Sequence, residues 1–148
     1  MEVFADKLIN ITRHNAEKIA EQWCKAVRSN PRTPFYHSIP IDECKRQAVD
    51  FYKNLRSIYY SEKPYAQLID FFTTYADDRN REGIPLNETV YALIMMRRHL
   101  WLFADFQAPF LAGLDIKQKV GTINTTIRIF DHGIYTITKR YQELAQQQ

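Results

Sequence analysis

The sequence predicts an all-α protein, a single-domain antiparallel bundle of about five helices that ends in a long C-terminal helix. Apolar residues recur at steps of three and four along most of the chain, and no long stretch alternates with the period of two that marks a strand. The prolines and two of the four glycines, Gly83 and Gly113, fall between these periodic segments, where helices begin and end. A length of 148 residues suits one domain, residues 1–148, with its own hydrophobic core.

The first two predicted helices flank a proline-rich segment. The first covers residues 2–28, and its apolar face consists of Phe4, Leu8, Ile11, Ile19, Trp23 and Val27. It ends before Pro31, because a proline disfavours helical geometry in the residue that precedes it. Residues 31–40 contain three prolines and are expected to form an extended loop whose aromatic side chains pack on the body. The second helix covers residues 41–60.

The third predicted helix begins at Pro64 and ends at Gly83, since proline is tolerated in a first turn and glycine is common just past a last one. Its inner line consists of Tyr65, Leu68, Phe72, Tyr75 and Arg79. The fourth helix begins at Pro85 and extends to about residue 110. Its line consists of Val90, Leu93, Arg97, Leu100 and Ala104, and Ile94, Met95 and Trp101 widen this surface. We therefore expect the fourth helix to be the most buried.

The fifth predicted helix begins near Asp115 and carries the most regular apolar pattern. We call this pattern the seam; it consists of Ile116, Val120, Ile123, Ile127, Phe130, Ile134, Ile137, Tyr141 and Leu144. Such a repeat indicates a helix packed along its length, and a helix of about 30 residues spans about 45 Å. This helix could carry a structural change from the core to a partner. Alternatively, it is only the last helix of the bundle, and the seam is core.

Composition narrows the classes of function. The net charge of +3 is too small to indicate a nucleic-acid or membrane surface, and no apolar run approaches the length of about 20 residues that spans a bilayer. Cys24 and Cys44 are too few for a disulfide framework, and we expect both to be small buried hydrophobes in a reducing cytoplasm. The N-terminus lacks the apolar core of a signal peptide. We therefore expect a cytoplasmic protein with no nucleic-acid or membrane partner.

No pattern of chemistry-bearing residues predicts an enzyme. The four histidines fall on different segments, and the Glu-x-x-His spacing of di-iron bundles does not occur. A nucleophile elbow is also missing, and four glycines leave no Gly-rich phosphate loop. We expect no catalysis, no metal and no cofactor. His99 is the one candidate for a haem ligand, a less favoured alternative.

Two arginines, Arg79 and Arg97, lie on inward-facing lines. A guanidinium carried into a core needs a carboxylate or carbonyl partner, because an unpaired buried charge is very costly. The candidate partners are Asp77, Asp78, Asp105 and Asp131, and Asp131 is the most suggestive because Phe130 beside it belongs to the seam. The arginines form internal salt bridges or reach the surface, or they line a pocket for an anion or small ligand. The candidate ligand-binding residues are Arg79, Arg97, Trp101 and Asp131.

Several stretches together resemble a known family. They are Trp23 with residues 30–36, then residues 79–86, then residues 92–101, and finally Phe130, Asp131 and Tyr141. In order and spacing they resemble the RsbRD-like N-terminal domain. This domain stands at the front of stressosome-type negative regulators of stress sigma factors and of some sensor histidine kinases. The resemblance covers nearly the whole chain, and its most specific part is Arg-x-x-x-Gly-x-Pro-Leu at residues 79–86, with the arginine-bearing helix after it.

The resemblance implies a non-catalytic helical sensory or signal-input domain, often homodimeric, that passes a change to a downstream signalling or anti-sigma-type partner. It assigns no ligand. No output domain follows in this sequence, so we expect either an excised domain or a stand-alone member with a separate partner. The alternative is a dimerisation or protein-interaction module without a small ligand. It would pair through the seam, where Gly121 and Gly133 permit close helix approach.

Overall fold

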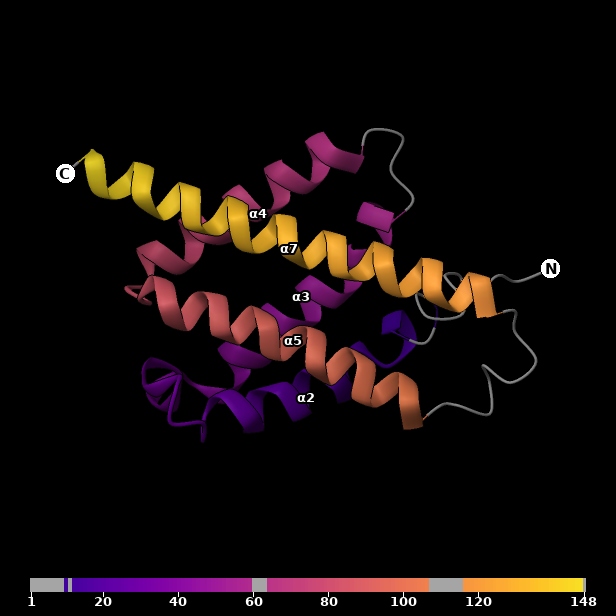
Figure 1. Ribbon diagram of the computed structural model, residues 1–148. Helices are drawn as coiled ribbons and strands as arrows, with labels where there is room; N and C mark the ends of the chain where they lie inside the picture. Colours follow the sequence, from indigo (N-terminus) through magenta and orange to yellow (C-terminus); the bar gives the residue numbers. More distant parts are fainter. Residues whose placement is uncertain (1–9, 11, 60–63, 107–115, 148) are drawn as a thin grey trace.

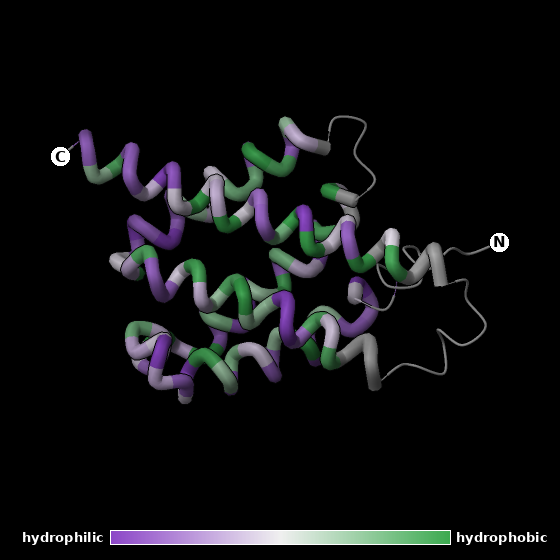
Figure 2. Tube along the Cα trace, in the orientation of Figure 1, coloured by the Kyte–Doolittle hydropathy of each residue, from purple (hydrophilic) through white to green (hydrophobic). Residues whose placement is uncertain are grey.

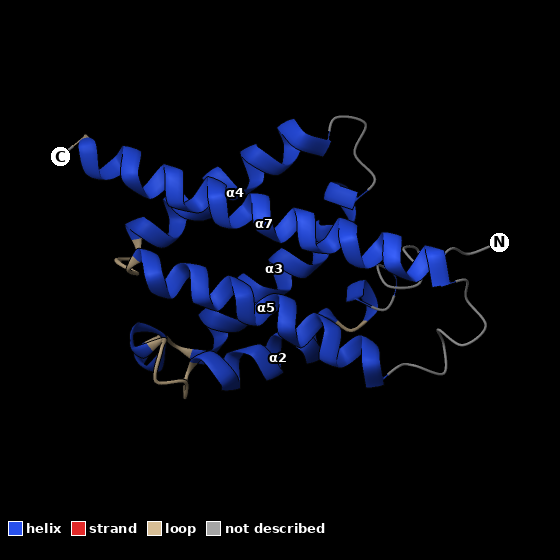
Figure 3. Cartoon of the chain, viewed as in Figure 1, coloured by secondary structure: helices blue, strands red, loops and turns tan. Residues whose placement is uncertain are grey.

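The computed structural model describes residues 10, 12–59, 64–106 and 116–147, and every regular element within these ranges is a helix (Figures 1 and 3). The elements are α2 (Ala16–Val27), the 3-10 helix η1 (Pro34–Ser38), α3 (Ile41–Tyr59), α4 (Pro64–Arg81), α5 (Leu86–Phe106) and α7 (Ile116–Gln146). The predicted all-α bundle with a long C-terminal helix is confirmed.

The helix predicted over residues 2–28 is interrupted within its described part. Residues 12–14 are helical, but Asn15 has φ −116° and ψ 18°, and α2 begins at Ala16. Asparagine favours such breaks because its side chain competes for backbone hydrogen bonds. Beyond the break, α2 buries the predicted residues Ile19, Trp23 and Val27. The other predicted members of this face, Phe4, Leu8 and Ile11, lie outside the described residues.

Residues 31–40 are not the extended loop that the prolines suggested, because Pro34 opens the 3-10 helix η1. Side chains hold this turn in place: the Thr33 hydroxyl donates to the Val27 carbonyl oxygen at 2.7 Å, and the Phe35 N–H donates to Glu88 Oε1 at 2.7 Å. The expected packing of its aromatic residues is confirmed, since Tyr36 is fully buried with its ring edge-on to Trp23.

The turn between α4 and α5 follows the prediction closely. Gly83 has φ +86°, a conformation that favours glycine, and its N–H donates to the Asn80 carbonyl oxygen at 3.0 Å. The Ile84 N–H donates to the Arg79 carbonyl oxygen at 3.1 Å, which completes the helix end. At the other end of α4 the inner line is shorter than predicted. Tyr65 is 59% exposed and stacks edge-on against His132, because the core contacts of α4 begin only at Leu68.

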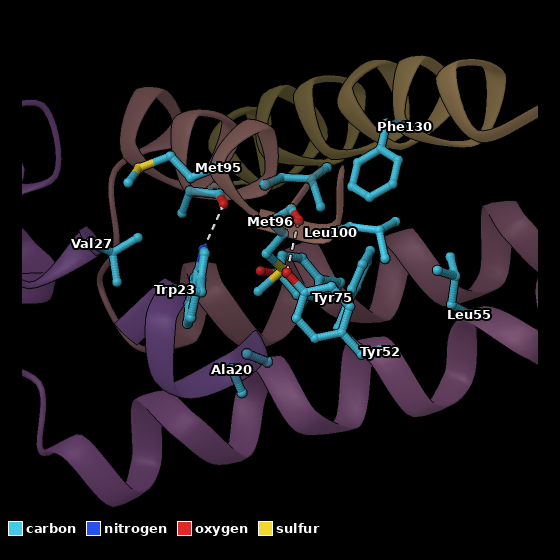
Figure 4. Packing of buried hydrophobic residues seen from close by; sticks show 14 of the residues in the cluster. Ala20, Trp23, Val27, Tyr52, Leu55, Tyr75, Met95, Met96, Leu100 and Phe130 are labelled. Carbon is cyan, nitrogen blue, oxygen red and sulfur yellow. Dashed lines mark hydrogen bonds between the residues drawn. The ribbon is translucent and has the colours of Figure 1, made fainter. Parts of the chain in front are cut away.

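The core lies where the helices meet. Figure 1 shows α5 between α2 and α7, and the Trp23 indole N–H of α2 donates to the Ala92 carbonyl oxygen of α5 at 2.9 Å (Figure 4). The Tyr52 hydroxyl of α3 donates to the Met96 carbonyl oxygen of α5 at 2.8 Å. Rings of α3, α4 and α7 form one aromatic cluster, which consists of Phe51, Tyr52, Phe71, Phe72, Tyr75 and Phe130.

Helix α7 is unbroken over 31 residues, through both of its glycines, and apolar residues recur along it (Figure 2). The seam, however, is buried only in its C-terminal part. Phe130, Ile137 and Tyr141 are buried, and Ile134 and Leu144 are half-buried. Nothing is described of the Ile116 side chain. The expectation of packing along the whole length is wrong for Val120, Ile123 and Ile127, which are 49%, 39% and 39% exposed.

Helical drift accounts for part of the departure of the seam from the core. A straight α-helix drifts about 20° per heptad from a repeat of 3.5 residues, so Val120, three heptads before Tyr141, is turned by about 60° from it. In this part of α7 the core instead takes Thr126 and Ile129, which are 0% and 5% exposed. Val120 is therefore turned away from the core, whereas Ile123 lies about five full turns from Tyr141, on the same side of the helix, and its exposure does not follow from this drift.

Candidate functional site between α3 and α4

A cavity of about 680 Å³ lies between α3 and α4 and reaches the turn that follows α4. Its wall combines aromatic rings with many charged groups. Three arginines line it, together with four carboxylates: Arg46, Arg79 and Arg81, and Asp50, Asp70, Asp78 and Glu82. This wall is more polar than that of most small-molecule sites, which are lined mainly by apolar and aromatic side chains.

The most buried cation of this wall is Arg79, which Glu82 neutralises. Arg79 Nε donates to Glu82 Oε2 at 3.1 Å, and Arg79 Nη2 donates to Glu82 Oε1 at 2.9 Å. The guanidinium also lies over the Tyr75 ring, 4.8 Å from its centroid. Burial lowers the pKa of Arg79, but Tyr75 and Glu82 beside it more than offset this, so its pKa is raised and it stays charged.

Glu82 was not among the predicted partners of Arg79. The predicted candidates Asp77 and Asp78 pair with other arginines: Asp77 with Arg140, and Asp78 with Arg81 at 3.3 Å. The Asp105 side chain lies outside the described residues. The turn at Gly83 brings Glu82, one residue past the end of α4, back to the guanidinium. Helical periodicity predicts the direction of side chains only within a helix, so it does not predict the direction of Glu82, which lies in a turn.

Two polar atoms in the cavity wall are buried without a hydrogen-bond partner among the described residues. Gln47 Nε2 donates to Glu82 Oε2 at 3.1 Å, but Gln47 Oε1 accepts no hydrogen bond. The Tyr75 hydroxyl is also unpartnered, and burial raises its pKa although the Arg79 guanidinium opposes the shift. Gln47 and Tyr75 are 8% and 7% exposed. Neither residue was singled out as polar in the sequence, where Tyr75 counted only as apolar.

The other three candidate residues lie outside this cavity. Arg97 pairs with Asp131 at 3.9 Å, as the sequence suggested, and its guanidinium lies 6.0 Å from the centroid of the Phe130 ring. Trp101 is half-buried and packs against the core. In the described part of the chain, no hydrogen bond or ion pair joins Arg79 to any of these three residues. The four candidates are therefore not assembled around one cavity.

Hydrogen bonds connect the last turns of α7 to α4, to the turn beyond it and to the first turn of α5. Arg140 Nε donates to Asp77 Oδ1 at 2.5 Å, and Nη2 donates to Asp77 Oδ2 at 3.4 Å. The Tyr141 hydroxyl donates to the Ile84 carbonyl oxygen at 2.8 Å and lies 2.9 Å from the Thr89 hydroxyl. We call these contacts the α7 clasp. Sequence reasoning missed it, although a tyrosine among the aliphatic residues of the seam was a usable signal.

No family model, curated protein or solved structure that was compared with this chain matches it. Within the described ranges, no three or more histidine, cysteine, aspartate or glutamate side chains gather as a metal site would need. None of the helices described here has the length and apolarity that crossing a membrane requires.

Proposed function

We propose that this chain is a non-catalytic cytoplasmic signal-input domain whose α7 passes the state of the α3–α4 cavity to an output partner. The α7 clasp carries the proposal, because its anchors adjoin the wall of the cavity. Asp77 precedes Asp78 and Arg79 of that wall, and Ile84 lies two residues beyond Glu82. The resemblance to RsbRD-like domains supports the same function and points to a downstream signalling or anti-sigma-type protein as the partner.

The mechanism is a shift between two arrangements of one turn. Glu82 pairs with Arg79 in the wall of the cavity, and Gly83 connects Glu82 to Ile84, whose carbonyl oxygen accepts a hydrogen bond from Tyr141. A ligand or partner that moves Glu82 therefore moves the Ile84 carbonyl oxygen, to which Tyr141 of α7 is hydrogen-bonded. It shifts the population only by its preference for one arrangement over the other.

A variant of the cavity wall tests this coupling without a ligand. Glu82→Gln replaces the bidentate carboxylate, which weakens its charge-assisted hydrogen bonds to Arg79. We expect amide hydrogen exchange in residues 142–146 to become about tenfold faster, which corresponds to about 1.4 kcal/mol of local stability. Asp78→Asn is the matched control, because it breaks the exposed pair with Arg81 on the same helix. Equal exchange in both variants, or uniformly faster exchange along α7, contradicts the relay.

A second function, pairing with a second copy of this chain, is favoured by the exposed part of the seam. Val120, Ile123 and Ile127 form an apolar stripe on the outside of α7. Residues 120–127 contain no charged side chain, so two copies would meet without repulsion. A Cβ on Gly121 would have no atom within 4 Å, which leaves room for the second helix. The stripe matches the predicted homodimer and fits the alternative of an interaction module.

Sedimentation at several concentrations tests this pairing. The wild-type protein is expected to dimerise as its concentration rises, and Ile123→Asp is expected to remain monomeric with an unchanged melting temperature. Tyr135→Asp is the control, because Tyr135 is 66% exposed elsewhere on α7. A wild-type protein that stays monomeric at all concentrations, or an equal effect of both substitutions, rules out the dimer.

A further inference from the structure

Tyr91 of α5 contacts two arginines that come from different parts of the chain. Arg32 belongs to the turn before η1; its Nη1 donates to the Tyr91 hydroxyl at 3.5 Å, and its Cζ lies 5.6 Å from the centroid of the Tyr91 ring. Arg98 belongs to α5 itself and lies about two turns beyond Tyr91, on the same face of the helix. Because helical side chains lean toward the N-terminus, Arg98 reaches back and hydrogen-bonds to the same hydroxyl.

Hydrogen bonds hold the turn that carries Arg32 against α5. The Arg32 N–H donates to Asn30 Oδ1 at 2.8 Å. On the other side of Arg32, the Phe35 N–H donates to Glu88 of α5. The backbone of Arg32 is therefore placed beside α5 before any ligand binds, which lowers the entropy lost on binding.

The two arginines carry positive charge that the described residues do not neutralise. No carboxylate of these residues forms an ion pair with Arg32 or Arg98. Glu88, about one turn before Tyr91, is 5% exposed and accepts from the Phe35 N–H. Hydrogen bonding from Arg32 and Arg98, together with their charges, lowers the pKa of Tyr91. Two like charges that share one hydroxyl repel each other, and an anion between them would remove this repulsion.

The three side chains offer hydrogen-bond donors that a solute can reach from water. Arg32 and Arg98 are exposed and Tyr91 is half-buried, so no part of the fold has to open. A guanidinium carries five N–H donors, and the contact of Arg32 with Tyr91 uses one of them. The Tyr91 oxygen accepts from the arginines and keeps its own O–H as a donor. Guanidinium donors beside an O–H match the acceptor oxygens of an oxyanion.

We propose that Arg32, Tyr91 and Arg98 form a binding site for the phosphoryl group of a small phosphate monoester. At about pH 8 such a group carries nearly two negative charges and three acceptor oxygens, so it balances both guanidinium groups. A carboxylate or a sulfate ester carries one charge and balances only one of them. None of the three residues lines the α3–α4 cavity. Binding here goes beyond the proposed function and does not depend on the relay through α7.

Two probes of nearly equal shape test the ligand class. Methyl phosphate is a dianion at about pH 8, and methyl sulfate is its monoanionic counterpart. In NMR titrations of the whole chain at constant ionic strength, methyl phosphate is expected to give saturable shifts centred on residues 31–33 and 91–98. Methyl sulfate is expected to bind at least about fivefold more weakly. The absence of saturable methyl phosphate shifts, or equal binding of the two probes, overturns the proposal.

Three arginine variants assign the binding to this site. Arg32→Gln and Arg98→Gln are each expected to keep the melting temperature, because both side chains are exposed, and to weaken methyl phosphate binding about fivefold. Arg128→Gln is the matched control, since it removes the same charge from an exposed position on α7. If all three variants lose affinity equally, only the net charge of the protein attracts the anion and there is no site.

The pKa of Tyr91, followed through the NMR signals of its ring, tests the site without a ligand. Arg98→Gln is expected to raise this pKa toward the ordinary tyrosine value of about 10, and Arg128→Gln is expected to leave it unchanged. An unchanged Tyr91 pKa in Arg98→Gln means that Arg98 does not reach the hydroxyl, and the site is wrong. A raised pKa without methyl phosphate binding confirms the contact and removes the ligand class.

Discussion

Gly133 of α7 lies directly against the Phe72 ring of α4. A Cβ on Gly133 would be 2.6 Å from Phe72 Cζ and 2.7 Å from Cε1, far inside van der Waals contact. Phe72 is fully buried, and its centroid lies 5.2 Å from that of Phe71 and 6.2 Å from that of Phe51. The Phe72 ring is therefore closely surrounded by other side chains and has little room to move. This contact sets the spacing between α4 and α7, on which the α7 clasp depends.

Gly133→Ala is expected to destabilise the protein even though alanine is the better helix former. The added methyl group must push α7 away from a ring that cannot yield, and such overpacking costs about 1–3 kcal/mol. Urea denaturation measures the change. Gly121→Ala is the control, since nothing lies within 4 Å of a Cβ there, and it is expected to stabilise by about 0.5–1 kcal/mol. A Gly133→Ala variant at least as stable as the wild type contradicts this packing.

Tyr141→Phe is expected to loosen the end of α7. The substitution removes the hydroxyl that donates to the Ile84 carbonyl oxygen and lies 2.9 Å from Thr89 Oγ1, and it leaves both buried groups short of a partner. The loss is about 1–3 kcal/mol in the free energy of unfolding. Tyr135→Phe, at an exposed tyrosine of the same helix, is expected to stay within about 0.5 kcal/mol of the wild type. If the two variants unfold at the same urea concentration, the clasp does not stabilise α7.

The helices and most of their ends could be predicted because local chemistry determines them. Pro64 and Gly83 mark the ends of α4 through backbone geometry that no tertiary contact is needed to explain. The seam was harder, because its repeat of seven residues is readable but its rotation relative to the core is not. Only the packing of α4 and α5 against α7 decides that Phe130 is buried and Val120 is exposed.

The candidate site was predictable only in part. Arg97 and Asp131 could be paired because Arg97 lies on one regular apolar line and Asp131 follows Phe130 of the seam. Arg79 was correctly placed inside, but its partner Glu82 comes from a turn, where periodicity gives no direction. The cavity itself leaves no mark in the sequence. The cavity depends on how α3 and α4 pack against each other. Which buried polar atoms of its lining residues lack a hydrogen-bond partner, such as Gln47 Oε1, also follows only from the packed structure.

His99 is expected to make the fold less stable in mild acid. Its Nδ1 is buried without a partner in the described part of the chain, and burial, with Arg98 beside it, lowers the pKa of His99 below 6.5. The unfolded chain therefore takes up a proton at a higher pH than the folded one. The stability that is linked to the neutral form of His99 is fully present above about pH 6.5 and is lost as the pH falls below that value.

Urea denaturation at about pH 7.5 and about pH 5.5, on either side of the ordinary histidine pKa, measures this dependence. The wild-type midpoint is expected to be lower at the acidic pH, and His99→Gln is expected to reduce the difference because glutamine does not titrate. If the variant loses as much stability as the wild type, other groups cause the loss and His99 is not the origin.

The two cysteines are expected to resist alkylation in the folded protein. Cys24 of α2 and Cys44 of α3 are 3% and 0% exposed, so a reagent reaches them only after local opening. The Cys44 thiol hydrogen-bonds to Cys24, which lowers the pKa of Cys24 and raises that of Cys44. Iodoacetamide followed by mass spectrometry is expected to modify Cys24 first, and both residues at least about a hundredfold more slowly than in urea. Rapid modification of Cys44 in the native protein contradicts the close packing around this fully buried side chain.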